Sequence, residues 1–343
     1  MRFTLGYRAA SFKARVALLV VLLALCLLGW FVLRPPAAQP LVLAPVRMAI
    51  PLRIISAPMF VGMEQGAFRN AGVNIIAQPF EMARDALKSL MDGKSDLTLI
   101  ADTRLMFALL DGADIAVLAN VAQSRRSLGI VTRIDRGINR LADLQGKKIG
   151  LTLGTNLPYF LDALLQINSV GNDRVNWVDL DPDALHQAFK AGRIDAAAMF
   201  QPYLARLEQE MDGRVKVFFG EEVYAFRLVL VGRPGYIDSH PEEVRRVLKG
   251  LLTATDSIHA DPVAARRVVG KMFKMDDALM ARIFDPEDYV VSLDQALLLA
   301  LDDQSRWAMK ERLAPARAMP NFLNVTRYQF LETVKPGAVT LVH

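Results

Sequence analysis

The sequence has few of the residues on which catalysis and metal binding usually depend. It holds a single cysteine, Cys26, and its four histidines all follow residue 185 without the spacing of metal ligands. It also lacks a Gly-x-Ser-x-Gly elbow, a phosphate-binding P-loop and a dinucleotide fingerprint. We therefore expect no enzymatic activity, no catalytic residue, no metal and no cofactor. The absence of cysteine after Cys26 suits an oxidising compartment.

Acidic residues are absent from the first fifty positions, which hold six basic residues. Residues 51–343 contain the other 35 basic residues and all 36 acidic ones, so their net charge is close to zero. The overall charge of +5 therefore comes from the N-terminal segment and not from a basic face of the globular part. We do not expect nucleic acid as a partner.

One long apolar run, VALLVVLLALCLLGWFVL, occupies residues 16–33. As a helix it would be about 27 Å long, close to the thickness of the hydrocarbon core of a bilayer. Four basic residues lie in the stub 1–15, so the positive-inside rule keeps the N-terminus cytoplasmic. We predict one uncleaved transmembrane helix in the cytoplasmic (inner) membrane, with the globular part in the periplasm. A cleaved secretory signal is the alternative, and lipidation of Cys26 is disfavoured because Leu25 precedes it.

Five prolines between Pro35 and Pro51 predict a stiff linker over residues 34–50. Strands and helices then alternate, which predicts an α/β fold with mainly parallel sheets covered by helices. We expect strands at 52–55, 73–78, 97–101, 115–120, 147–152, 175–180, 194–200, 215–219 and 226–231. We expect helices at 58–70, 83–91, 104–110, 158–167 and 182–191, and a helical tail at 243–259, 262–272, 276–283 and 293–310. Because the cycle repeats, we predict two lobes, residues 51–128 with 232–343 and residues 129–231.

Four turns connect expected strands to the helices that follow them: 56–60, 101–103, 154–156 and 201–203. In open α/β sheets, ligands bind beyond the carboxyl ends of strands, where helix N-termini present free N–H groups. Thr155 and Asn156 can donate hydrogen bonds to such a ligand. The alternative is that they only cap the following helix, and the spacing leaves both interpretations open.

The segment LADLQGKKIGLTLGTNLPYFLDALL (141–165) resembles the hallmark segment of the nitrate/sulfonate/taurine (NMT1/THI5-like) class of periplasmic substrate-binding proteins. Residues 57–75, 86–103, 184–203 and 321–342 resemble further segments of that class in the same order. The resemblance covers residues from about 50 to 343. It implies a two-lobed periplasmic binding protein (type II) fold with a helical C-terminal tail. It also implies capture of a small molecule between the lobes and delivery to the permease and ATPase subunits of an ABC importer.

The resemblance also implies ligand-binding positions in all four turns. They are Ala57, Pro58, Met59, Asp102, Thr103, Gly154, Thr155, Asn156, Gln201 and Pro202, to which we add Tyr224 and Arg227 near the expected return crossing. The class implies a small oxyanion such as a sulfonate or nitrate. Asp102 departs from a simple anion site, because an uncompensated carboxylate would repel an anion. Either it pairs with Arg104 or Arg227, or the ligand carries an amine or ring N–H, as a taurine-like molecule or small heterocycle does.

Aromatic residues near these turns could stack on a flat ligand or belong to the core. They are Phe60, Tyr159, Phe200, Tyr203, Tyr224 and Phe226. The leading hypothesis is a membrane-tethered solute-binding protein of an ABC importer. The alternative is a ligand-sensing accessory module that reports to a signalling partner without transport, because a retained anchor would suit such a role.

Overall fold

The computed structural model describes residues 43–171, 174–314 and 319–342. The predicted stub at 1–15, the predicted anchor at 16–33 and most of the expected linker lie outside these residues. Within the described part of the chain, none of the helices combines enough length and apolar character to span a bilayer.

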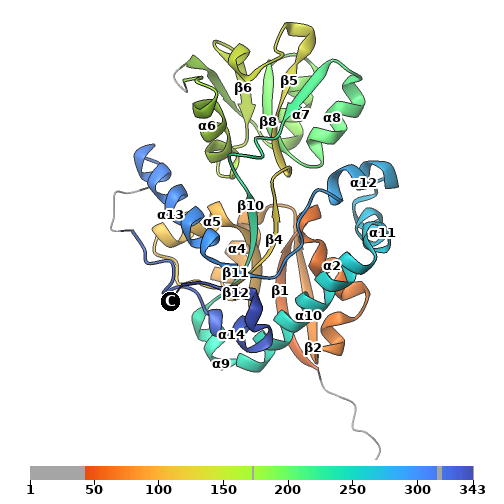
Figure 1. Ribbon diagram of the computed structural model, residues 1–343, viewed down its shortest axis with the longest axis vertical. Coiled ribbons are helices and arrows are strands. Elements are labelled where there is room, and N and C mark those ends of the chain that lie inside the picture. The colour runs from red at the N-terminus through yellow and green to blue at the C-terminus, as the bar shows by residue number, and fades with distance from the viewer. Residues whose placement is uncertain (1–42, 172–173, 315–318, 343) are drawn as a thin grey trace, which may run out of the picture. The chain divides into compact units, whose positions relative to one another are not determined.

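The first sheet has five strands in the order β2-β1-β3-β10-β4 (Figure 1). β1, β2 and β3 run parallel, whereas β10 runs antiparallel to both of its neighbours. The strands are β1 (Ala44–Pro51), β2 (Val73–Phe80), β3 (Leu97–Ala101), β4 (Ala116–Ser124) and β10 (Phe226–Gly232). Its helices include α2 (Ala57–Glu64), α3 (Ala67–Asn70), α4 (Ala83–Met91) and α5 (Asp102–Leu110).

The start of the first sheet differs from the prediction. β1 begins at Ala44, inside the expected linker, and the expected strand at 52–55 is a loop followed by the 3₁₀ turn η1 (Ile54–Ser56). Val46, Met48 and Ile50 alternate along β1 and are buried, as a strand requires. Prolines within or at the ends of an apolar stretch are tolerated near strand termini, so reading them as a linker was wrong.

The second sheet repeats this topology in the order β7-β6-β8-β5-β9. Its strands are β5 (Leu128–Arg133), β6 (Lys148–Leu151), β7 (Asn176–Asp179), β8 (Ala196–Phe200) and β9 (Val215–Phe218). Its helices are α6 (Leu157–Ile167), α7 (Pro182–Lys190) and α8 (Tyr203–Met211), with the 3₁₀ turns η2 (Ile134–Arg136) and η3 (Leu141–Leu144). β5 was not predicted; it runs antiparallel to β8 and β9 and is buried throughout.

The return crossing comes earlier than predicted. We placed residues 129–231 in the second lobe, but β10 pairs with β3 and β4 of the first sheet, so the chain crosses back between β9 and β10. An apolar strand such as β10 carries no local signal of which sheet it joins, because burial on both faces looks the same in either.

The chain after β10 is mainly helical. It forms α9 (Pro234–Ser239), α10 (Pro241–Ala260), α11 (Pro262–Phe273), α12 (Asp277–Phe284), α13 (Gln295–Lys310) and α14 (Tyr328–Val334), with short strands β11 (Leu293–Asp294) and β12 (Val339–Thr340) and the 3₁₀ turn η5 (Pro336–Ala338). α10 packs on α2 and α3, α13 packs on α5, and α14 packs on β4. We call these elements and the first sheet with its helices the first lobe, and β5–β9 with their helices the second lobe.

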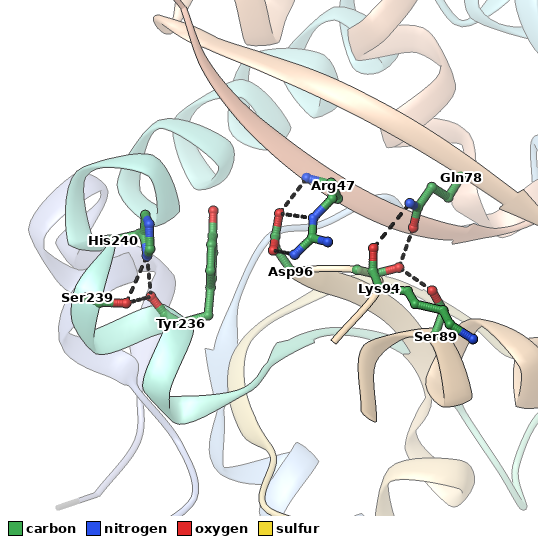
Figure 2. A network of polar contacts seen from close by, with 9 residues as sticks. Arg47, Gln78, Ser89, Lys94, Asp96, Tyr236, Ser239 and His240 are labelled. Atoms are coloured by element: carbon green, nitrogen blue, oxygen red, sulfur yellow. Dashed lines mark hydrogen bonds and ion pairs between the residues drawn. The ribbon is translucent and has the colours of Figure 1, made fainter. Parts of the chain in front are cut away.

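A polar network joins β1 and β2 to the segment that leads into β3 (Figure 2). The Asp96 carboxylate accepts hydrogen bonds from the backbone N–H of Arg47 at 2.8 Å and from its guanidinium. Gln78 on β2 hydrogen-bonds to the backbone of Lys94. These contacts hold β1 and β2 in register with the start of β3.

Candidate functional site

A cavity of about 360 Å³ lies between the two lobes, at the carboxyl ends of strands from both sheets. The first lobe contributes Pro51, Arg53, Ile54, Ile55, Met82, Ala83, Arg84, Ala101, Thr103, Arg104, Phe107, Phe226 and Leu228. The second lobe and the β4–β5 crossing contribute Ser127, Leu128, Leu153, Gly154, Thr155, Asn156, Phe200 and Gln201. The residues that follow β1, β2, β3, β6 and β8 therefore meet at one place, as expected of a ligand site in α/β sheets.

Arg53 follows β1 and is half-buried in this cavity. Its guanidinium lies 5.0 Å from the centre of the Phe200 ring, and one N–H donates to the carbonyl of Leu52 at 2.9 Å. None of the ion pairs found within residues 43–171, 174–314 and 319–342 includes Arg53. Burial lowers the pKa of Arg53, while the nearby Tyr203 and Glu81 groups oppose that shift without forming an ion pair with it.

Two further arginines lie at helix starts on the same side of the cavity. Arg84 is in the first turn of α4 and Arg104 in the first turn of α5. Burial lowers the pKa of Arg104, and the nearby charge of Arg84 lowers it further. Arg104 donates to the carbonyl of Gly154 across the cleft, where a φ of +70° favours glycine. An anion between these groups would relieve their mutual repulsion.

The rest of the polar lining reinforces this positive character. The N-termini of α4, α5 and α6 all reach the cavity, and each presents backbone N–H groups and a partial positive charge. The lining residues within the described part of the chain include no aspartate or glutamate. An anionic ligand is therefore favoured here over a cationic one.

The remaining wall of the cavity is apolar. Ile54, Ile55, Phe107, Phe200 and Phe226 line the cavity together with Leu128 and Leu153. Such a surface suits the apolar body of a ligand, because apolar contact area contributes about 25 cal/mol per Å² removed from water. The cavity thus combines a cluster of positive charge with an apolar wall.

Asp102 does not line the cavity. Its side chain is fully buried, and its carboxylate accepts hydrogen bonds from the Tyr224 hydroxyl, the Gln304 amide and the Thr103 backbone N–H. Burial raises the pKa of Asp102, while the bonds from Tyr224 and Gln304 oppose that rise. Neither Arg104 nor Arg227 forms an ion pair with it within the described residues, although the charge of Arg227 also stabilises the carboxylate. Asp102 is occupied by protein groups and is not available to a ligand amine.

The other positions expected to face a ligand fall into two groups. Thr103, Gly154, Thr155, Asn156 and Gln201 line the cavity. Ala57, Pro58, Met59, Pro202, Tyr224 and Arg227 do not; the first three are buried in α2, and Pro202 caps α8. Tyr224 and Arg227 lie behind the wall, where Tyr224 contacts Asp102 and Thr103.

The capping alternative applies in part to the residues that do line the cavity. The Thr155 hydroxyl donates to the Thr152 carbonyl at 2.7 Å and accepts from the backbone N–H of Leu157 at 3.3 Å. The Gln201 side chain accepts from the backbone N–H of Ala205. The polar atoms of these two side chains therefore bond to backbone groups at the starts of α6 and α8. Thr155 and Gln201 contribute to the shape of the cavity more than to its hydrogen-bonding capacity.

Sequence reasoning missed the arginines. Arg53 lies two residues after the end of β1, and a strand placed at 44–51 would have put it in the first strand-to-helix turn. Arg84 and Arg104 each occupy the first turn of a helix whose position was predicted closely, but arginines at such positions are too common in sequences to single out.

Comparison with known proteins now adds to this geometry. Residues 54–265 match the family described as NMT1/THI5 like. A Brucella abortus (strain 2308) protein named as a binding protein is 24% identical over 221 residues, which cover 64% of this chain and 68% of that protein. The taurine-binding periplasmic protein of Escherichia coli (strain K12) is 24% identical over 222 residues, 63% of this chain and 68% of that protein.

Solved structures share the fold. The periplasmic aliphatic sulphonate binding protein SsuA from Escherichia coli has a TM-score of 0.70 at 18% identity, covering 81% of this chain and 94% of that one. The desulfurization enzyme DSZB has a TM-score of 0.67 at 15% identity, covering 85% of this chain and 99% of that one. These likenesses confirm the predicted α/β two-sheet fold, which binding proteins share with at least one enzyme.

Proposed function

This chain belongs to the NMT1/THI5-like family, and on that premise we propose that it is a solute-binding protein that captures a small organic anion between its lobes. It then delivers the anion to the permease and ATPase subunits of an ABC importer. The observation that carries the proposal is a cavity between facing strand ends that holds three arginines and no acidic side chain among its described lining residues. The names of two of the similar proteins, for taurine and aliphatic sulphonate binding, support this ligand class.

The dimensions and lining of the cavity narrow the ligand. A volume of 360 Å³ equals the share of about twelve water molecules at ~30 Å³ each, so nitrate would fill little of it. A taurine-like amine would lie among three arginines with no carboxylate to accept its protons, since Asp102 is engaged by Tyr224 and Gln304. We therefore propose an alkane- or arylsulfonate, or a similar anion, with an apolar body and no amine.

Capture is favoured over chemical conversion. The described lining residues provide hydroxyl, amide and guanidinium groups, but no carboxylate, imidazole, thiol or lysine amine to act as acid, base or strong nucleophile. Arginine keeps its proton under ordinary conditions, so it serves here as an anion anchor.

We expect the ligand class to appear in a thermal-shift screen of the full chain in detergent. Benzenesulfonate and butanesulfonate should raise the melting temperature, because a ligand at 100 times its Kd stabilises the native state by about 2.7 kcal/mol. Nitrate and taurine at the same concentration serve as the matched controls and should leave the melting temperature unchanged. Stabilisation by taurine alone would refute the amine-free ligand, and no response to any anion would refute an anion site.

We also propose that residues 16–33 tether the globular part to the outer face of the cytoplasmic membrane. The charge-free run of 18 residues after a basic stub supports this placement. The chain should remain in the membrane fraction after carbonate extraction, and its N-terminal sequence should start before residue 16. A mature N-terminus close to residue 39 would instead indicate a cleaved signal.

A further inference from the structure

The C-terminal helices α12 and α13 lie on opposite sides of the first lobe, at the end that faces the second lobe (Figure 1). α13 contacts α6 through Trp307, and α12 contacts α8 through Arg282. Both helices belong to the first lobe, because α13 packs on α5 and α12 packs on α11 and η1. We propose that α12 and α13 form a two-sided clasp that stabilises the closed arrangement of the lobes, so that its strength sets the ratio of closed to open protein. The proposal rests on the proposed function only in treating the cavity as the ligand site.

The α13 side of the clasp is the better buried one. The Trp307 indole N–H donates to the Asp162 carboxylate at 3.0 Å, and the Trp307 ring packs edge-on against Tyr159 with 5.3 Å between ring centres. Asp162 is 5% exposed, and Gln166 donates to the same carboxylate oxygen at 2.8 Å. Burial raises the pKa of Asp162, and its other carboxylate oxygen, Oδ1, is buried without a hydrogen-bond partner in the described residues. The indole N–H therefore offsets part of the cost of burying this carboxylate, and its loss should disfavour the closed arrangement.

The same helix also supports the wall of the cavity. Gln304 lies three residues before Trp307, on the same face of α13, and donates to Asp102 at 2.9 Å. Asp102 accepts from Tyr224, whose ring packs edge-on against Tyr159 at 5.4 Å. One face of α13 therefore contacts the first lobe through Gln304 and the second lobe through Trp307. Gln304 and Tyr224 thus connect the clasp to Asp102 and to Thr103, which lines the cavity.

The α12 side is an exposed ion pair. Arg282 lies 2.6 Å from Glu208 on α8, and the two side chains are 52% and 31% exposed. Water and salt screen such a pair, so it should contribute less to closure than the Trp307 contact.

Distances between spin labels on the two lobes test the clasp without any ligand. In the full chain with Cys26→Ser, nitroxides at Ile76→Cys in the first lobe and Ala191→Cys in the second occupy exposed positions. The ratio of long to short distances in the native protein without added ligand is the reference for the variants. Trp307→Phe keeps an aromatic ring but removes the N–H donor, and it should raise the ratio of open to closed protein about tenfold. Arg282→Gln should shift the ratio in the same direction but less.

Arg306→Gln is the matched control, because Arg306 lies on α13 but pairs with Asp302 of the same helix. It should leave the distance distribution unchanged. The clasp is refuted if Trp307→Phe, folded by circular dichroism, keeps the native distribution, or if Arg306→Gln opens the lobes equally. Because no ligand is added, a positive result combined with an unresponsive anion screen would overturn the proposed function and leave the clasp standing.

Discussion

Replacing Arg53 with leucine is expected to weaken binding of benzenesulfonate by about 100-fold, because a charged hydrogen-bond donor at a desolvated site contributes roughly 2–3 kcal/mol. Among the three arginines, Arg53 is half-buried, lies over the Phe200 ring and forms no ion pair in the described residues, although the charge of Glu81 acts on it. Its charge is therefore free to be neutralised by a ligand. Isothermal titration of the native chain and the variant measures the change directly.

Two variants make this prediction specific. Arg84→Leu removes an arginine whose side chain is 62% exposed, so we expect a loss of benzenesulfonate affinity several-fold smaller than that of Arg53→Leu. Arg53→Lys keeps the charge but loses the planar guanidinium. Its affinity for benzenesulfonate should lie between those of the native protein and Arg53→Leu. Binding by Arg53→Leu within threefold of the native value would remove Arg53 from the site.

Glu287→Gln is expected to flatten the dependence of stability on pH between about 5 and 8. Glu287 lies between α12 and β11, at the crossing of the lobes, and is 8% exposed. Its carboxyl group accepts a hydrogen bond from the Ser127 hydroxyl at 2.9 Å, and Ser124 contributes a second. Burial raises the pKa of Glu287 from 4.5 to about 8.

The direction of the effect follows from that rise. The folded protein holds the proton of Glu287 more tightly than the unfolded chain does, so the contribution to stability is complete below about pH 4.5. It declines as the pH rises and is lost above about pH 8. The full difference is on the order of 4–5 kcal/mol, at 1.36 kcal/mol per pH unit. Glutamine is neutral at every pH and keeps an acceptor for Ser127.

Urea denaturation at pH 5, 6.5 and 8 measures the effect. The free energy of unfolding should fall with pH in the native protein more steeply than in Glu287→Gln. Glu81→Gln, at an exposed position, is the control and should follow the native curve. Parallel curves for the native chain and Glu287→Gln would show that Glu287 is ionised in the fold.

The alternating order of strands and helices was readable from the sequence because buried apolar runs and turn residues recur in a regular cycle. The turn at Gly154–Asn156 was found in this way, and its residues line the cavity. The first strand, β1, was not predicted from the sequence, since Pro45 and Pro51 near its ends made this stretch look like a linker. The same error kept Arg53 out of the predicted site residues, because Arg53 follows a strand only when β1 is assigned to residues 44–51.

Contacts between distant segments explain the remaining differences. Asp102 was predicted as a ligand residue, but its partners Tyr224 and Gln304 are 122 and 202 positions away in the chain. No local pattern indicates that such residues surround it. The return crossing was misplaced for a similar reason, because β10 joins the first sheet through pairing with β3 and β4.

A crystal structure of the chain with benzenesulfonate tests the anion site most directly. We predict the sulfonate oxygens within hydrogen-bond distance of the Arg53 guanidinium and the backbone N–H groups of residues 154–156, with the ring against Phe107, Phe200 and Phe226. A ligand found outside the cleft, or bound inside it with no contact between its anionic group and Arg53, would contradict the assignment.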